Sequence, residues 1–158
     1  HCLLLYFIEY LKAGHMTLKQ LIKLEDKAKE VWVISPTLHY DTENSEFSEL
    51  VSVNLGEKTK YRYIVPATKT VEKNLKVYKK IYKVSEADIA KNFLILPECE
   101  FIPFMEETAI YDASTNCVAC AAPATEDSND VIKFNATTSK TMAKAFKTLW
   151  KKYKRVNP

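Results

Sequence analysis

Apolar residues recur along the chain with two different periods. Four segments repeat them at intervals of three and four residues, which is the spacing of one buried helix face. These segments are residues 17–30, 45–56, 70–83 and 137–153. Two short continuous apolar runs, residues 31–34 and 61–65, each follow one of the first two segments and are typical of strands covered on both faces. The first half of the chain is therefore predicted to alternate helix and strand.

The second half of the chain changes to short strands. Strong β-formers bounded by turn residues predict strands at 92–96, 101–104, 108–112, 117–121 and 131–134. Residues 35–44 are polar and interrupted by Pro36, so they are predicted to form a loop at the carboxyl end of the first strand. This order of elements predicts an α/β fold, a three-layer sandwich with a mixed β-sheet.

Small polar residues and one glycine indicate where the helices begin and end. Ser45 is expected to cap the start of the second helix, and Gly56 is expected to end it in the left-handed conformation. Ser85 with Asp88 can begin a further short turn of helix, and Asn135 or Thr137 can cap the closing helix.

The composition is that of one domain. A chain of 158 residues with 47% hydrophobic and 27% charged residues matches a single hydrophobic core. Residues 16–158 are therefore predicted to be a single domain. Gly14–Met16 resembles the remnant of a cloning site ahead of an initiator methionine, so residues 1–15 are either cloning-derived or the end of an upstream helical segment.

The cysteines and the amino-terminal apolar run bear on location and cofactors. The run over residues 2–11 is about half the length that spans a bilayer, so no membrane contact is expected. Four scattered cysteines do not form a secreted disulfide scaffold, which favours a cytoplasmic location. Cys117 and Cys120 should point to opposite faces of a strand and be buried apolar side chains. We therefore predict no metal and no cofactor.

The positive charge is unevenly distributed, although the net charge is only +3. Residues 140–158 hold seven basic side chains and no acidic one, and residues 69–83 hold six lysines. Two such helices can bind nucleic-acid phosphates if their lysines converge on one surface. The alternative is that both lysine-rich faces are simply solvated.

One polar cluster lies at the carboxyl end of the first predicted strand. In an open α/β sheet, ligands bind at this edge. We therefore predict that Ser35, Thr37, His39 and Asp41 contact a small-molecule ligand, together with the segment that follows Pro66. The alternative is that these side chains cap the next helix and satisfy turn amides.

The sequence contains no familiar catalytic pattern. Its 2 glycines cannot form a Walker loop or a dinucleotide fingerprint, and no Gly-x-Ser-x-Gly elbow occurs. The carboxylate pairs Glu106-Glu107 and Glu126-Asp127 are predicted to lie in loops and face water. These observations favour a binding or regulatory role over catalysis.

The order of elements resembles a phospholipase D-like domain. The resemblance rests on the strand 31–34 closing on Ser35-Pro36, the helix ending at residues 54–57, the strand Lys60–Pro66, and a later hairpin of residues 109–121. The closing helix is similar to the last helix of such domains in prokaryotic transcriptional regulators. The resemblance covers roughly residues 18–153 and implies one half of the usual phospholipase D-like architecture.

The catalytic motif of that family is missing. Active members use a His-x-Lys motif with a downstream Asp, in which the histidine is the nucleophile. Residues 104–108, which stand at that place, contain neither His nor Lys, and no catalytic role passes to Asp112. The resemblance therefore implies a non-catalytic fold. Because family members bring two halves together, it also implies a homodimer.

These observations predict a non-catalytic ligand-sensing or dimerisation module of a prokaryotic, bacterial-type regulatory protein. Nucleic acid would be reached through an upstream domain or through the basic helices. Two alternatives stay open. One is a phosphodiester-acting enzyme with a non-standard site, using His39 with Asp41 or Asp112. The other is a nucleic-acid-binding module that uses its lysine-rich helices.

Overall fold

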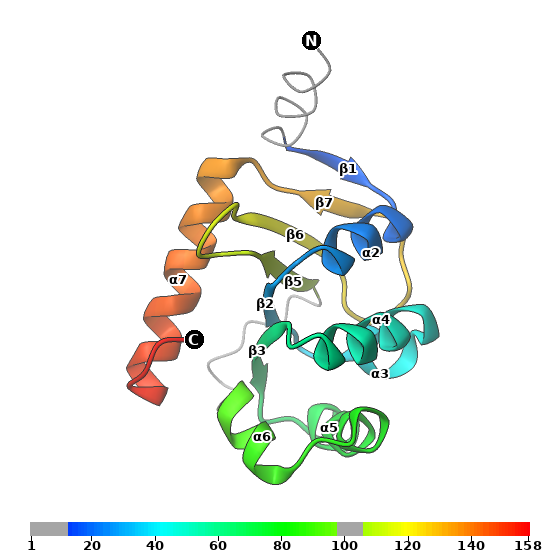
Figure 1. Cartoon of the computed structure of the whole chain (residues 1–158), viewed down its shortest axis with the longest axis vertical. Coiled ribbons are helices and arrows are strands. Elements are labelled where there is room, and N and C mark those ends of the chain that lie inside the picture. The colour runs from blue at the N-terminus through cyan, green and yellow to red at the C-terminus, as the bar shows by residue number, and fades with distance from the viewer. Residues whose placement is uncertain (1–12, 98–105) are drawn as a thin grey trace.

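The computed structural model describes residues 13–97 and 106–158. They form one mixed sheet with helices on both faces (Figure 1). The strands are β1 (Gly14–Met16), β2 (Glu30–Ile34), β3 (Lys60–Pro66), β4 (Phe93–Leu96), β5 (Glu106–Tyr111), β6 (Val118–Pro123) and β7 (Val131–Lys133). The helices are α2 (Leu18–Asp26), α3 (His39–Glu43), α4 (Ser45–Gly56), α5 (Lys69–Tyr82), α6 (Glu86–Asn92) and α7 (Ala136–Lys154).

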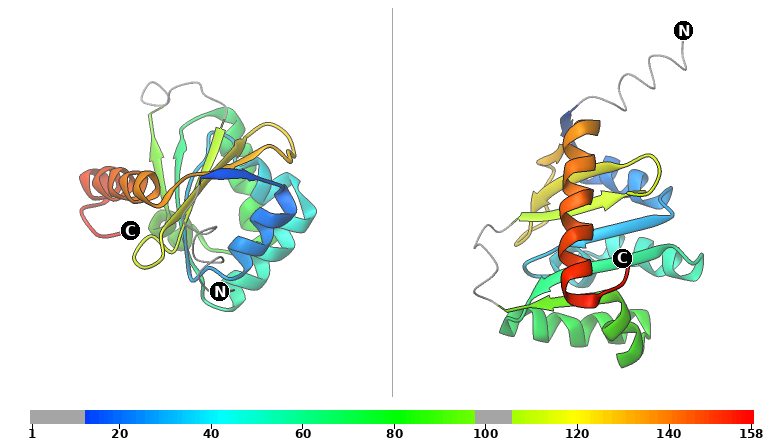
Figure 2. Two further views of the ribbon diagram at one scale, coloured as in Figure 1. Left: turned by 90° about the horizontal axis from the view of Figure 1, so that it is seen from above. Right: turned by 90° about the vertical axis from the view of Figure 1, so that its left-hand side faces the viewer.

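The sheet has a parallel part and an antiparallel part. Its strand order is β1-β7-β6-β5-β2-β3-β4. β2, β3 and β4 run parallel, whereas β5, β6, β7 and β1 pair antiparallel in turn from β2 outward. Helices α2 to α6 lie on one side and α7 lies on the other (Figure 2). The predicted α/β fold, a three-layer sandwich with a mixed sheet, is confirmed.

The two faces of the sheet carry separate hydrophobic cores. Val31, Val33 and Tyr63 point to the face covered by α2 to α6. Trp32 and Ile64 point to the face covered by α7. Because neighbouring residues of β2 and β3 enter different cores, both strands are buried on both sides, as their continuous apolar runs predict.

The core beneath α7 is built around stacked aromatic rings. The Phe146 ring lies between Trp32 and Trp150, with ring centroids 5.0 Å and 5.8 Å apart. All three side chains are buried. Each such ring contributes about 1.5–3 kcal/mol by leaving water, so this stack fixes α7 on the sheet.

Two predicted helix ends are wrong, and two are confirmed. Asn44, not Ser45, caps α4, because its side chain accepts a hydrogen bond from the Phe47 amide. Gly56 is the last helical residue, and the left-handed conformation falls instead on Lys58, with φ of 67°. Ser85 and Asp88 form a capping box that starts α6, and Asn135 caps α7.

Residues 35–44 contain more structure than the predicted loop. Leu38 adopts φ of 63°, and the short helix α3 follows it directly. The predicted strand 101–104 lies outside the described residues. Gly14–Met16 pairs with β7 as an edge strand, and the origin of residues 1–15 stays a prediction.

Candidate functional site

Ser35 is the first residue after β2 and faces the neighbouring strand β5. Its hydroxyl donates to Glu107, with 2.5 Å between Oγ and Oε2. The same oxygen accepts from the Leu38 amide at 2.8 Å. Ser35 is fully buried. It therefore ties the turn after β2 to a carboxylate of β5.

Thr37 and His39 turn away from Ser35, towards the segment after β6. The Thr37 hydroxyl donates to the Ala124 carbonyl at 2.5 Å. His39 Nε2 lies 3.0 Å from Asp127 Oδ1, and its Nδ1 lies 3.4 Å from Glu43 Oε2. Both side chains therefore hold the segment after β6 against α3. The Thr37 hydroxyl also accepts from the His39 amide at 3.1 Å, which is the turn-amide role given as the alternative to ligand binding.

Asp41 lies on α3 and points into the protein. The Tyr63 hydroxyl donates to its Oδ1 at 2.8 Å, and the Tyr82 hydroxyl donates to its backbone carbonyl. Burial in the core raises the pKa of Asp41 to about 6. Ser35 and Asp41 therefore face inward, while Thr37 and His39 face a different part of the molecule. The four predicted residues do not form one shared contact surface.

Glu25 is a second buried carboxylate that the sequence did not single out. It projects from α2, and the hydroxyls of Tyr61 and Tyr111 donate to its two oxygens at 2.8 Å and 2.9 Å. Burial, followed by the charge of Asp41, raises the pKa of Glu25 to about 8. A large fraction of this side chain therefore carries a proton at neutral pH.

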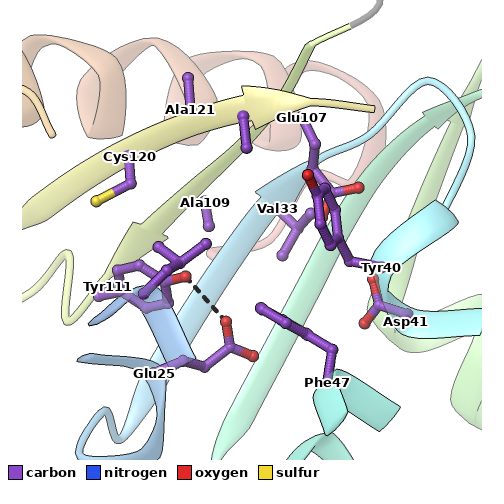
Figure 3. A pocket seen from close by; sticks show the side chains of 12 residues that line it. Glu25, Val33, Tyr40, Asp41, Phe47, Glu107, Ala109, Tyr111, Cys120 and Ala121 are labelled. Carbon is purple, nitrogen blue, oxygen red and sulfur yellow. Dashed lines mark hydrogen bonds between the residues drawn. The ribbon is translucent and has the colours of Figure 1, made fainter. Parts of the chain in front are cut away.

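Glu107 is the third buried carboxylate, and the prediction that it faces water is wrong. It lies on β5, and burial, together with the charge of Asp41, raises its pKa well above the ordinary value. Glu25, Asp41 and Glu107 all line one small cavity, with Tyr40 and Phe47 beside them (Figure 3). Its volume of about 20 Å³ is enough for about one water molecule.

The small size of this cavity disfavours phosphate chemistry at the carboxyl end of β2. Its volume of about 20 Å³ has room for about one water molecule and not for a phosphoester group. Ser35 already donates its proton to Glu107. The region therefore matches a packed, hydrogen-bonded core better than a site that accepts a phosphoryl group.

A wider hollow, of about 280 Å³, opens at the carboxyl ends of β3 and β4. The described residues that line it are Pro66, Ala67, Thr68, Lys69, Val71, Glu72, Leu75 and Ile95. Thr68 caps α5 at its rim by accepting from the Val71 amide. Ile95 is 46% exposed here. The hollow includes the segment after Pro66 that the sequence analysis named as part of the expected ligand site.

Asp112 lies at the other end of β2 from His39. Its Oδ1 accepts from the amides of Lys29 and Glu30, where β2 begins. The five residues of β2 span roughly 16 Å and separate this point from the turn that leads to His39. The suggested pairing of His39 with Asp112 is therefore wrong.

The two described cysteines and the lysine-rich helices also have clear positions. Cys117 and Cys120 are buried in the two different cores, as predicted. α5 packs with α3 and α4 on the face opposite α7, so the two lysine-rich helices do not converge.

Within residues 13–97 and 106–158, no three His, Cys, Asp or Glu side chains are grouped to hold a metal ion. None of the helices in these ranges is long and apolar enough to cross a bilayer.

Comparison with known proteins identifies a similar fold and no family. No protein-family model and no curated protein match the sequence. The crystal structure of polyphosphate kinase from Porphyromonas gingivalis is similar, with a TM-score of 0.55 and 14% identity. The match covers 87% of this chain and 26% of the kinase, so the chain corresponds to about a quarter of that protein. At this identity the likeness concerns the fold alone, and it agrees with the α/β fold with a mixed sheet described above.

Proposed function

We propose that this chain is a non-catalytic module of a prokaryotic regulatory protein that senses a small molecule at the carboxyl ends of its parallel strands. The hollow beside Pro66 and Ile95 carries this proposal. Its volume of about 280 Å³ is close to the lower end of small-molecule sites, about 300 Å³. It also lies at the sheet edge where open α/β folds bind ligands.

The lining of the hollow indicates the chemistry of its ligand. Val71, Leu75 and Ile95 give it an apolar wall, and Ile95 leaves nearly half of its surface uncovered. Lys69 and Glu72 place one charge of each sign at the same hollow. A small molecule with an apolar body and one charged group would fit these surroundings.

The hydrogen bonds at the carboxyl end of β2 support a non-catalytic role. His39 lies between two carboxylates, Glu43 and Asp127. Asp41, two residues further on, is buried against Tyr63. These contacts stabilise the fold. They also point His39 and Asp41 at different partners, so the two side chains do not form a catalytic pair. A phosphodiesterase would instead hydrolyse bis(p-nitrophenyl) phosphate and lose that activity in His39→Ala, which would refute the proposal.

Assembly is the second part of the proposed role. The phospholipase D-like resemblance implies that two halves meet, so we expect a homodimer of the 18.2 kDa chain. Sedimentation equilibrium measures this directly. A monomer across the accessible concentration range would contradict the proposed dimer. It would not affect the proposed ligand site, which has a separate test.

Ligand binding can be tested with a matched pair of probes. Benzoate and benzylamine share an apolar ring and differ in charge, and methyl NMR reports where each one binds. We expect shifts at Val71, Leu75 and Ile95, with Ile95→Ala weakening them. Val53 and Ile132 are exposed apolar residues outside the hollow, and Ile132→Ala is the matched control. Equal shifts at both sets of methyl groups, or none with either probe, would contradict the site.

A further inference from the structure

The net positive charge of the protein comes from its closing segment, residues 140–158. The chain has 23 basic and 20 acidic residues, and residues 140–158 hold seven of the basic ones and none of the acidic ones. Residues 1–139 therefore hold 16 basic and 20 acidic residues, a formal charge of −4 against +7 for the closing segment. The small net charge is therefore the sum of an acidic main part and a strongly basic closing segment.

The basic residues of α7 form a line along its solvent side. At 100° per residue, Lys140, Lys144, Lys147 and Lys151 fall within one narrow sector of the helix, and Arg155 is the residue that caps its C-terminal end; all five are exposed. We refer to these five residues as the α7 basic stripe. It extends from Lys140 to Arg155, 16 residues separated by 15 steps of about 1.5 Å, or about 22 Å. Phe146 and Trp150 on the buried side hold the helix against the sheet, so the backbone that carries the stripe is fixed in place.

Acidic side chains within residues 13–97 and 106–158 do not pair with the stripe. Among the described residues, the salt bridges involve none of its five side chains. On α5, by contrast, Lys76 pairs with Glu72 and Lys79 with Glu86. Like charges four residues apart on a helix repel, and the first turn of α7 has no acidic residue to offset the helix dipole. Lys151, in the last turn, is favourably placed for the helix dipole, whereas the repulsion between successive lysines of the stripe opposes the stability of the helix.

We infer that the α7 basic stripe is a docking surface for the phosphate backbone of duplex DNA. Each strand of a duplex presents a phosphate about every 3.4 Å along its axis, so about 22 Å spans about six phosphates. A line of four lysines on the helix, followed by Arg155 at its C-cap, complements such a stiff, linear array. This surface is separate from the small-molecule hollow, and the inference does not depend on the proposed function.

The side chains beside the stripe favour nucleic acid over a lipid surface. Thr137, Thr141 and Thr148 flank it and are exposed, and threonine hydroxyls are common partners of DNA phosphates. A helix that lies in a membrane needs large apolar residues next to its cations. The exposed residues of α7 are lysine, threonine and alanine except for Tyr153 in its last turn, so a single large side chain lies next to the cations. α7 is also the one described helix packed on its face of the sheet (Figure 2), and α6 meets it only at its C-terminal end, where Lys154 donates to the Ala90 carbonyl.

The inference is tested by fluorescence anisotropy with a labelled DNA duplex of about 20 base pairs, titrated at several NaCl concentrations. Binding at about 50 mM NaCl should weaken steeply with salt, with a slope of log K against log salt of about −4 to −4.5. Lys144→Ala with Lys147→Ala should reduce that slope by about 1.8 and weaken binding at least about tenfold. Both side chains are exposed, and circular dichroism checks that the fold is retained.

The matched control is Lys73→Ala with Lys80→Ala. These two lysines are exposed on α5, on the opposite face of the sheet, and their removal changes the net charge equally. We expect this variant to bind DNA as the unmodified protein does. Three results would overturn the inference. They are an equal loss in both variants, no binding at about 50 mM NaCl, or binding to phosphatidylserine vesicles without binding to DNA.

Discussion

Replacing Glu25 by glutamine keeps the shape of the side chain and removes its ability to ionise. In the native protein this carboxyl is buried between Tyr61 and Tyr111, and its pKa is raised to about 8. In the unfolded chain it titrates near its ordinary value of 4.5. Between these two values the folded state keeps a proton that the unfolded state releases. The native fold therefore loses stability as the pH rises through this range.

The size of this effect follows from the two pKa values. Each pH unit between them costs the folded state about 1.4 kcal/mol. From pH 4.5 to pH 7 the free energy of unfolding should therefore fall by about 3 kcal/mol because of Glu25 alone. In Glu25→Gln this contribution disappears. The amide has one acceptor oxygen for two tyrosine hydroxyls, which should lower the free energy of unfolding by about 1 kcal/mol at every pH. Because this loss does not change with pH, the slope of the free energy of unfolding against pH still reports the ionisation of Glu25.

Urea denaturation between about pH 4.5 and about pH 7.5 measures this slope. We expect the variant to gain stability relative to the native protein as the pH rises. Asp41 and Glu107 keep their own raised pKa values, so part of the native slope should remain. Glu49→Gln removes an exposed carboxyl of α4 and is the matched control. Parallel curves for the native protein and Glu25→Gln would refute the reasoning.

Three further changes test how the fold is held together. Phe146→Ala empties the centre of the stack under α7 and should lower the free energy of unfolding by about 3–5 kcal/mol in urea titrations. Asn135→Ala removes the side chain that accepts from the Thr138 amide and should cost about 1 kcal/mol, read from the thermal midpoint. Lys58→Gly relieves a left-handed residue, with φ of 67°, and should raise that midpoint through about 1 kcal/mol of added stability. A lowered midpoint in Lys58→Gly would contradict its reasoning.

The central strands were predictable because burial on both faces leaves an unmistakable pattern. The continuous run at β2 requires an apolar side chain at every position, whichever core it enters. The structure of the turn after β2 was harder to predict from the sequence. The short helix α3 depends on Leu38 adopting φ of 63° and on contacts with the distant Ala124 and Asp127. Neither contact can be inferred from neighbouring residues.

The buried carboxylates were missed, although the periodicity contained a signal for them. Glu25 stands seven residues after Leu18 and four after Leu21, on the apolar stripe of its helix. Glu107 shares a strand face with Ala109 and Tyr111. Because glutamate is usually exposed, these two positions were not recognised as buried from the sequence. The tyrosine hydroxyls that donate to Glu25 come from β3 and β5, so their role required the sheet order.

The stack of Trp32, Phe146 and Trp150 makes the protein its own optical probe. These are the chain's 2 tryptophans, and both lie in the layer between the sheet and α7. Intrinsic emission therefore reports on that layer without any attached dye. If α7 lifted from the sheet, both indoles would meet water together, the emission maximum would move to longer wavelength, and acrylamide would quench it.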